Sequence, residues 1–359
     1  MIPLFWPTIF REEWGKALDG VFQTRWIGQG PQVDAFEDAF AAKFDFPFCL
    51  ALNSCTSALA LAYHLVGLRP GDIVLTPVLT CTATNIPLLH LGADIRFVDI
   101  DPWTLTMDLE DFRRKCTEEV AAVVVVTLGG VPCAPEIYKI AASMDIPVIV
   151  DAAQSLGVGM PHGDLVCYSF QAIKHFTTGD GGMLCLHDFE LYERAKKLRW
   201  FGIDREAKKK ADWMCIANHQ MTMDIEEPGF KMHMNDIAAT MGLVGLLHSD
   251  ELLLQRHELV SHYVDALSSR IECVYGGSYW LFGILTSYRD GLAVALRAQD
   301  IECDLVHLRN DIFRAFGGTR QDLPNMNRLE GRYLYLPLHT NLTIADVERT
   351  TKCVLQYLL

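Results

Sequence analysis

Short apolar runs alternate with amphipathic stretches along the first half of the chain. Each run is nearly continuous and predicts a buried strand, at Cys49–Leu52, Ile73–Thr76, Ile95–Asp99, Val123–Thr127, Val148–Asp151, Leu165–Ser169 and Met183–Leu186. Helical periodicity begins near Val33 and predicts further helices over Ala58–Val66, Thr82–Leu91 and Ala134–Met144. Continuous apolar strands that alternate with helices are typical of a parallel sheet covered on both faces.

The pattern changes near Phe189. A helix rich in basic residues begins there, a polar connection rich in methionine runs to residue 235, and one long helix is predicted from Asp236 to about Ser268. At 359 residues the chain exceeds the usual size of one compact domain. We therefore expect an α/β large domain over residues 1–240, with a mostly parallel sheet flanked by helices, and a smaller α+β domain over residues 241–359.

Polar residues gather at the predicted strand ends, where ligands bind in parallel sheets. Asp151 closes one strand and Ser169 closes the next, and Lys174 follows Asp151 by 23 residues, just before the Gly-rich turn Thr177–Gly182. Pyridoxal phosphate (PLP) needs this set, because a lysine forms the Schiff base, an acid keeps the pyridine nitrogen protonated and a serine reaches the phosphate. The pattern predicts an enzyme that uses PLP, with Lys174 as the catalytic residue.

The neighbours of these residues support the same hypothesis. Cys55 and Thr56 lie at the start of a helix, whose free N–H groups form an anion cup, although an ordinary helix cap is the alternative. A buried Asp151 needs a partner such as a pyridinium N–H, unless it only caps the following turn. Gln154 is placed to hydrogen-bond the cofactor's ring oxygen. The apolar residues around Lys174 should lower its pKa and make it a nucleophile and base.

Three further groups are weaker candidates. Lys231 and His233 precede the long helix and supply two possible cations for a phosphate, or else belong to a solvated loop. His307 and Arg309 form a polar pair suited to an anionic or sugar ligand, or else a surface turn. His175, beside the lysine, is a candidate for substrate binding.

Composition narrows the class of protein. The formal charge of −14 argues against nonspecific binding to DNA or to anionic membranes. The eleven cysteines include no CxxC pair and no Cys/His zinc spacing, so we expect reduced thiols and no metal site. No signal peptide is recognisable, and the longest apolar stretch, Val120–Leu128, is too short to span a membrane. We expect a cytoplasmic protein without nucleic-acid or membrane partners.

The ordered motifs resemble those of the DegT/StrS-type nucleotide-sugar aminotransferases over most of the chain. For example, Asn53–Leu59 is similar to the family's N-S-G-T-x-A-L, and Asp151–Gln154 to the end of its E-D-A-A-Q. The other similar segments are Gly28–Phe40, Pro70–Pro77, Thr80–Thr84, Gly92–Asp101, Ser169–Gly182 and Leu336–His339. The resemblance implies a PLP-dependent transferase of fold type I, a homodimer with each active site at the subunit interface.

The resemblance also implies roles for individual residues. Lys174 would be the Schiff-base lysine, Asp151 the pyridinium partner and Gln154 a ring contact. Ser169, Thr56 and the backbone at Cys55 would hold the phosphate, and the loop with Lys231 and His233 would reach over from the partner subunit. Three departures stand out: Cys55 replaces a Gly or Ala, Cys81 replaces an aromatic residue that often stacks on the ring, and Lys231 and His233 replace Asn and Arg.

The implied activity is the transfer of an amino group from L-glutamate to a keto-sugar nucleotide. A 4-keto-6-deoxy sugar, giving a perosamine- or viosamine-type product, is the first expectation, and a 3-keto sugar is the alternative. A dehydratase is disfavoured because Lys174 is present, and a desulfurase because no mobile-loop cysteine motif is evident. A non-catalytic sensor with the same fold is the remaining alternative. The nucleotide and the sugar depend on segments 200–235 and 275–325, whose sequence does not specify them.

Overall fold

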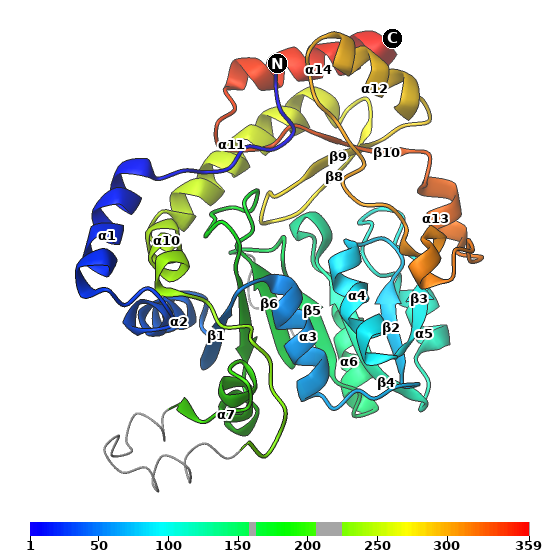
Figure 1. Ribbon diagram of the computed structural model, residues 1–359. Helices are drawn as coiled ribbons and strands as arrows, with labels where there is room; N and C mark the ends of the chain where they lie inside the picture. The colour runs from blue at the N-terminus through cyan, green and yellow to red at the C-terminus, as the bar shows by residue number, and fades with distance from the viewer. Residues whose placement is uncertain (158–162, 206–224, 359) are drawn as a thin grey trace, which may run out of the picture.

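The computed structural model describes residues 1–157, 163–205 and 225–358, and a seven-stranded sheet forms the middle layer of its larger lobe (Figure 1). The strand order is β1-β7-β6-β5-β4-β2-β3. All neighbouring strands are parallel except β7, which is antiparallel to both β1 and β6. The strands are β1 (Phe48–Leu52), β2 (Ile73–Pro77), β3 (Asp94–Val98), β4 (Val120–Val126), β5 (Val148–Asp151), β6 (Leu165–Ser169) and β7 (Gly182–Leu186).

Helices cover both faces of this sheet, as the continuous apolar strands predict. Helices α2 (Pro31–Phe44), α5 (Leu109–Lys115), α6 (Pro135–Ser143) and α10 (Asp236–Leu247) pack on one face. Helices α3 (Cys55–Leu65), α4 (Thr82–Leu91) and α7 (Phe189–Leu198) pack on the other. Successive strand residues enter opposite cores: Val148 and Val150 face the first set of helices and Ile149 the second. Burial on both sides explains why these strands do not alternate in polarity.

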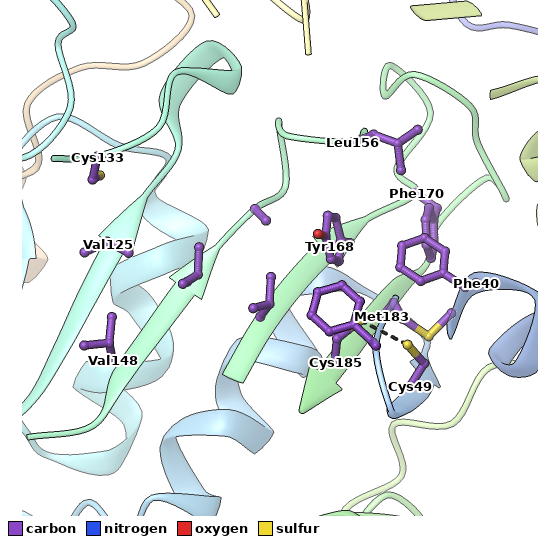
Figure 2. Packing of buried hydrophobic residues seen from close by; sticks show 14 of the residues in the cluster. Phe40, Cys49, Val125, Cys133, Val148, Leu156, Tyr168, Phe170, Met183 and Cys185 are labelled. Atoms are coloured by element: carbon purple, nitrogen blue, oxygen red, sulfur yellow. Dashed lines mark hydrogen bonds between the residues drawn. The ribbon is translucent and has the colours of Figure 1, made fainter. Parts of the chain in front are cut away.

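Aromatic rings and thiols fill the first core at the β1–β7–β6 end of the sheet (Figure 2). Phe40 of α2 packs its ring against Tyr168, with the centroids 5.2 Å apart. Cys49 and Cys185 face each other across β1 and β7, with their sulfur atoms 3.3 Å apart. The cysteines of the described ranges are free thiols.

The prediction of one long helix from Asp236 to about Ser268 is wrong. The structure has two helices, α10 and α11 (Ser249–Leu267), which meet at His248 with a bend of 58°. His248 stacks on Phe10, with the ring centroids 4.5 Å apart, and its Nε2 lies 2.9 Å from Glu13 Oε2. The bend turns α11 away from the sheet, and periodicity does not register it because both helices are apolar on their buried sides.

The C-terminal lobe is a smaller layer, which we define as β8 (Glu272–Tyr275), β9 (Phe282–Leu285) and β10 (Tyr333–Leu336) with α11, α12 (Arg289–Ala298) and α14 (Ile344–Leu358). Its three strands are antiparallel in the order β10-β9-β8. The first residues of the chain belong to this core too, because Ile2 forms a β-bridge with Ile301. The predicted domain boundary at residue 240 stays a prediction.

Two further helices, α1 (Arg11–Thr24) and α13 (Pro324–Leu329), complete the elements used below. Among the described residues, no single helix is both long and apolar enough to cross a bilayer, and only α10 and α11 taken together as a bent pair reach that length and apolar content.

Candidate active site

A cavity of about 430 Å³ opens beyond the C-terminal ends of the central strands. Its floor comes from the sheet and its adjoining loops, with Asp151 as the last residue of β5, Ser169 as the last residue of β6 and Lys174 on the connection to β7. Its roof comes from the C-terminal lobe and from the N-terminal residues Leu4 and Phe5. This is the edge of an open sheet at which ligands bind.

Asp151 is a buried carboxylate with two hydrogen-bond donors. Thr84 Oγ1 donates to its Oδ2 over 2.7 Å, and the backbone N–H of Ala153 donates to its Oδ1 over 3.1 Å. Burial raises the pKa of Asp151, and the bond from Thr84 is the largest of the contacts that oppose this rise. Thr80 Oγ1 lies 2.8 Å from Thr84 Oγ1 and continues the chain of hydroxyls. A carboxylate held in this way is oriented to meet a cation such as a pyridinium.

Lys174 shares the cavity with Asp151. Removal from water lowers the pKa of the lysine ammonium, while the negative charge of Asp151 acts in the opposite direction. The Nζ atom lies 3.9 Å from the centroid of the Trp280 ring. A lysine whose pKa is lowered by burial is more often neutral at physiological pH, and therefore a better nucleophile and base.

The start of α3 forms an anion cup at the same cavity. Ser54 caps the helix by accepting a hydrogen bond from Ser57 N over 3.0 Å, so the N–H groups of Cys55 and Thr56 begin the helix without intrahelical partners. Gly182 packs against this turn: a Cβ atom there would lie 2.5 Å from backbone atoms of Ser54 and Cys55. Burial raises the pKa of the Cys55 thiol, which therefore stays neutral beside an anion.

These residues fit PLP. The cup suits a phosphate, Asp151 suits the ring nitrogen, and Lys174 lines the same cavity. Ser169 stands beside Gly182 in the paired strands β6 and β7, which brings its hydroxyl to the cup. Cys81, at the start of α4, also lines the cavity. This position therefore contributes a thiol and not the aromatic side chain expected from the family pattern.

Gln154 and His307 meet across the cavity. Gln154 Oε1 accepts a hydrogen bond from Gly129 N over 2.5 Å, and its Nε2 lies 2.9 Å from His307 Nε2. Because an amide NH₂ only donates, His307 Nε2 accepts, and burial lowers the pKa of His307 to about 3, so the ring is neutral. The backbone N–H of His307 donates to Leu305 O over 2.6 Å. This bond closes a tight turn at Val306, whose φ is +61°, a conformation that is strained for a β-branched residue.

Four of the candidate residues lie away from the cavity in this chain. His175 is buried, with Nε2 2.7 Å from Ser278 O. Arg309 is fully buried and donates to both carboxylate oxygens of Asp311, over 2.7 and 2.6 Å. Lys231 Nζ lies 4.8 Å from the Trp200 ring centroid, and His233 packs on the same ring. Residues 206–224 of the segment expected to select the substrate lie outside the described residues.

Sequence reasoning assigned no role to three residues of the site: Thr84, Phe5 and Trp280. Thr84 stands in a recognisable motif, but only the fold reveals that its hydroxyl reaches Asp151, 67 residues away. Trp280 and Phe5 lie far apart in the sequence, and no local pattern distinguishes them from ordinary core residues.

The seven-stranded sheet with its reversed β7, and the lysine, acid and anion cup at one strand edge, define a PLP-dependent transferase fold of type I. Residues 9–355 match the family model described as the DegT/DnrJ/EryC1/StrS aminotransferase family. The chain belongs to this family, whose members act in sugar and polysaccharide biosynthesis, and membership implies PLP as the cofactor.

Individual relatives match from end to end. The chain is 30% identical to the spore coat polysaccharide biosynthesis protein SpsC of Bacillus subtilis over 98% of this chain and 96% of the other. It is 28% identical to the UDP-4-amino-4-deoxy-L-arabinose--oxoglutarate aminotransferase of Shewanella sediminis, with 98% and 97% covered.

Solved structures show the same fold. The crystal structure of AtS13 from Actinomadura melliaura superimposes with a TM-score of 0.91 at 34% identity, covering 99% of this chain and 98% of the other. The PLP-form of the putative sugar aminotransferase Spr1654 from Streptococcus pneumoniae has a TM-score of 0.88 at 26% identity, covering 100% and 99%.

Proposed function

We propose that this protein transfers an amino group from L-glutamate to a keto-sugar attached to a nucleoside diphosphate. The observation that carries the proposal is the placement of Lys174, Asp151 and the α3 anion cup around one cavity. Bound PLP supplies an electron sink for the charge that develops beside the amino-bearing carbon. The glutamate donor is supported by the name of the Shewanella sediminis relative, which is an oxoglutarate aminotransferase.

Different residues of this chain would bind the cofactor and carry the proton. The N–H groups of Cys55 and Thr56, with Ser169, would hold the phosphate, and Asp151 would keep a proton on the ring nitrogen. Lys174 would bind the cofactor between reactions and, once displaced by the amino donor, would carry a proton from the donor's Cα as general base and return it as general acid. Gln154 would contact the ring oxygen. The same steps in reverse would aminate the keto-sugar, so the kinetics should be ping-pong.

A 4-keto-6-deoxy sugar is our first candidate for the acceptor, with a perosamine- or viosamine-type product, and a 3-keto sugar is the alternative. The cavity supports a deoxy sugar because its walls include apolar side chains such as Leu4, Phe5 and Val306. We also propose a homodimer, in which Lys231 and His233 serve the partner's phosphate site. Their position outside this chain's own cavity supports that arrangement.

The decisive experiment is spectroscopic. The PLP-loaded protein is treated with L-glutamate, and loss of the visible absorption of the bound cofactor reports the first half-reaction. Candidate keto-sugars linked to GDP, dTDP or UDP are then added one at a time, and return of the absorption with one of them identifies the acceptor. If only 2-oxoglutarate restores the absorption, the assignment as an aminotransferase is supported and the assignment of a sugar-nucleotide acceptor is contradicted. If glutamate changes nothing, a non-catalytic protein is the better description.

Lys174→Ala tests the assigned catalytic residue. We expect no amino transfer in this variant, because neither the covalent link nor the proton carrier remains. Lys139→Ala is the matched control, since Lys139 is an exposed lysine of α6. Normal turnover by the Lys174 variant would remove the assignment.

A further inference from the structure

The β8–β9 loop of the C-terminal lobe, which we define as residues 276–281, contacts the residues on both sides of Lys174. The backbone oxygen of Ser278 accepts a hydrogen bond from His175 Nε2 over 2.7 Å. The indole N–H of Trp280 donates to Ile173 O over 3.3 Å. The residues immediately before and after Lys174 are therefore both bound to this loop, and Ser278 Oγ also donates to Gln154 O over 2.5 Å.

The loop also contacts Lys174 directly. The Nζ atom lies 3.9 Å from the centroid of the Trp280 ring, inside the range of a cation–π contact. Trp280 is 1% exposed, and its ring stacks on Phe5 with the centroids 5.3 Å apart and the planes 22° apart. The ring has no room to turn away, so its face stays presented to the lysine.

A buried arginine anchors the loop from behind. Arg256 of α11 is 1% exposed, and its Nη1 donates to three carbonyl oxygens, those of Tyr279, Trp280 and Leu338, over 3.2, 3.4 and 3.2 Å. Within the described ranges no carboxylate pairs with it. Burying a cation without a carboxylate partner is unfavourable. That Arg256 is nevertheless buried here, with hydrogen bonds to backbone oxygens, indicates that it serves to fix the position of the loop.

We propose that Trp280 is a positioning residue for Lys174, and that its ring receives the lysine ammonium whenever this amine is not bonded to the cofactor. The proposal rests on the proposed function, in which Lys174 is released and then carries a proton. A fixed resting place keeps the freed ammonium close to the reacting atoms and away from water. Arg256 and the β8–β9 loop hold the ring in place.

The sign of the effect follows from the chemistry. The face of the indole stabilises the charged ammonium and not the neutral amine, so loss of the ring should lower the pH at which Lys174 loses its proton. Other groups also face the lysine and remain in every variant; they are Asp151 of β5, Cys55 of α3, Cys81 before α4, Arg256 of α11, His175 and His307.

The test uses cofactor-free enzyme mixed with pyridoxal phosphate over a series of pH values. The rate constant for appearance of the visible absorption depends on the neutral amine of Lys174, so its pH midpoint reports that group without any turnover. We expect the midpoint to fall by about one pH unit in Trp280→Leu and by less in Trp280→Phe, which keeps a weaker ring. Trp103→Phe, an exposed tryptophan, should leave the midpoint unchanged.

The outcomes separate the two proposals. A midpoint in Trp280→Leu equal to or above that of the unmodified enzyme overturns the role of Trp280, whatever glutamate does. If Trp280→Leu does not fold, Trp280→Phe is the variant that decides, and an unchanged pH midpoint in it overturns the positioning role of Trp280. The rate of the half-reaction with saturating L-glutamate is a second readout, and it should fall while the concentration for half-maximal rate stays the same. A failure of the unmodified enzyme to react with glutamate counts only against the proposed function.

Discussion

The hydroxyl of Thr84 donates a hydrogen bond to Oδ2 of Asp151 over 2.7 Å, and both residues are buried. The bond joins the start of α4 to the end of β5. It opposes the rise in the pKa of Asp151 that burial causes, and so favours the charged form of the carboxylate. The charge at the ring nitrogen of the cofactor thus depends on a residue that does not itself need to touch the cofactor.

Thr84→Val should weaken PLP binding by about tenfold, since a hydrogen bond to a charged group contributes about 1.5–3 kcal/mol and part of it is regained by relaxation. The loss should grow as pH falls, because the pKa of Asp151 rises further without its donor. Equilibrium dialysis between pH 5 and pH 8 measures this. Thr76→Val is a matched control, because Thr76 is equally buried but donates to Asn85. Equal affinities in the two variants would contradict the prediction.

His307→Leu should slow the half-reaction with glutamate by roughly tenfold, because the amide of Gln154 loses its acceptor and turns more freely. The shape of the pH–rate profile should not change. His307 has a pKa of about 3, so it is neutral at every pH above 5 and contributes no inflection there. Stopped-flow absorbance at several pH values checks both statements. Disappearance of an inflection near pH 6–7 would show that His307 titrates during the reaction.

Arg309→Lys should lower the free energy of unfolding by about 3–5 kcal/mol, because lysine does not reproduce the bidentate contact and Asp311 is left buried with an incomplete partner. The sugar hypothesis predicts instead a higher Michaelis constant with ordinary stability. Denaturant unfolding and steady-state kinetics on the same preparation distinguish the two. Arg320→Lys, at an exposed arginine that pairs with Glu330, is the control and should leave the free energy of unfolding almost unchanged.

Glu227→Gln should remove a pH-dependent part of the stability. Arg194 donates to both carboxylate oxygens of Glu227, over 2.8 and 2.7 Å, and lowers the pKa of Glu227 to about 2. A carboxylate with a lowered pKa stabilises the fold above its ordinary pKa of 4.5, and this contribution disappears as the pH falls towards 2. The contribution is about 1 kcal/mol, because the pair is partly exposed and screened.

The measurement is unfolding by denaturant at pH 7, 4 and 3. The difference between Glu227→Gln and the unmodified protein should shrink as the pH falls. A constant difference would mean that the substitution acts through shape and not through charge.

The sheet and part of the site were predictable from the sequence because their signals are local. Buried strands between two helical layers must be continuously apolar. Asp151 and Ser169 end two such strands, and Lys174 follows the second of them within one stretch of the chain. The bend at His248 was not predictable, because it depends on Phe10 and Glu13, far away in the sequence. The burial of Arg309 follows from Asp311, two residues on, but acid and base neighbours occur equally often on surfaces.

The bridge between Ile2 and Ile301 sets an order of events during synthesis. Leu4 donates its N–H to Glu302, a residue that the ribosome adds 298 positions later. At about 5–20 residues per second this interval is roughly 15–60 s. The segment around Leu4 therefore stays without its partner until the segment around Glu302 has been made. Because Phe5 of that segment stacks on Trp280, the nascent protein completes its lysine pocket only after the C-terminal lobe has been made.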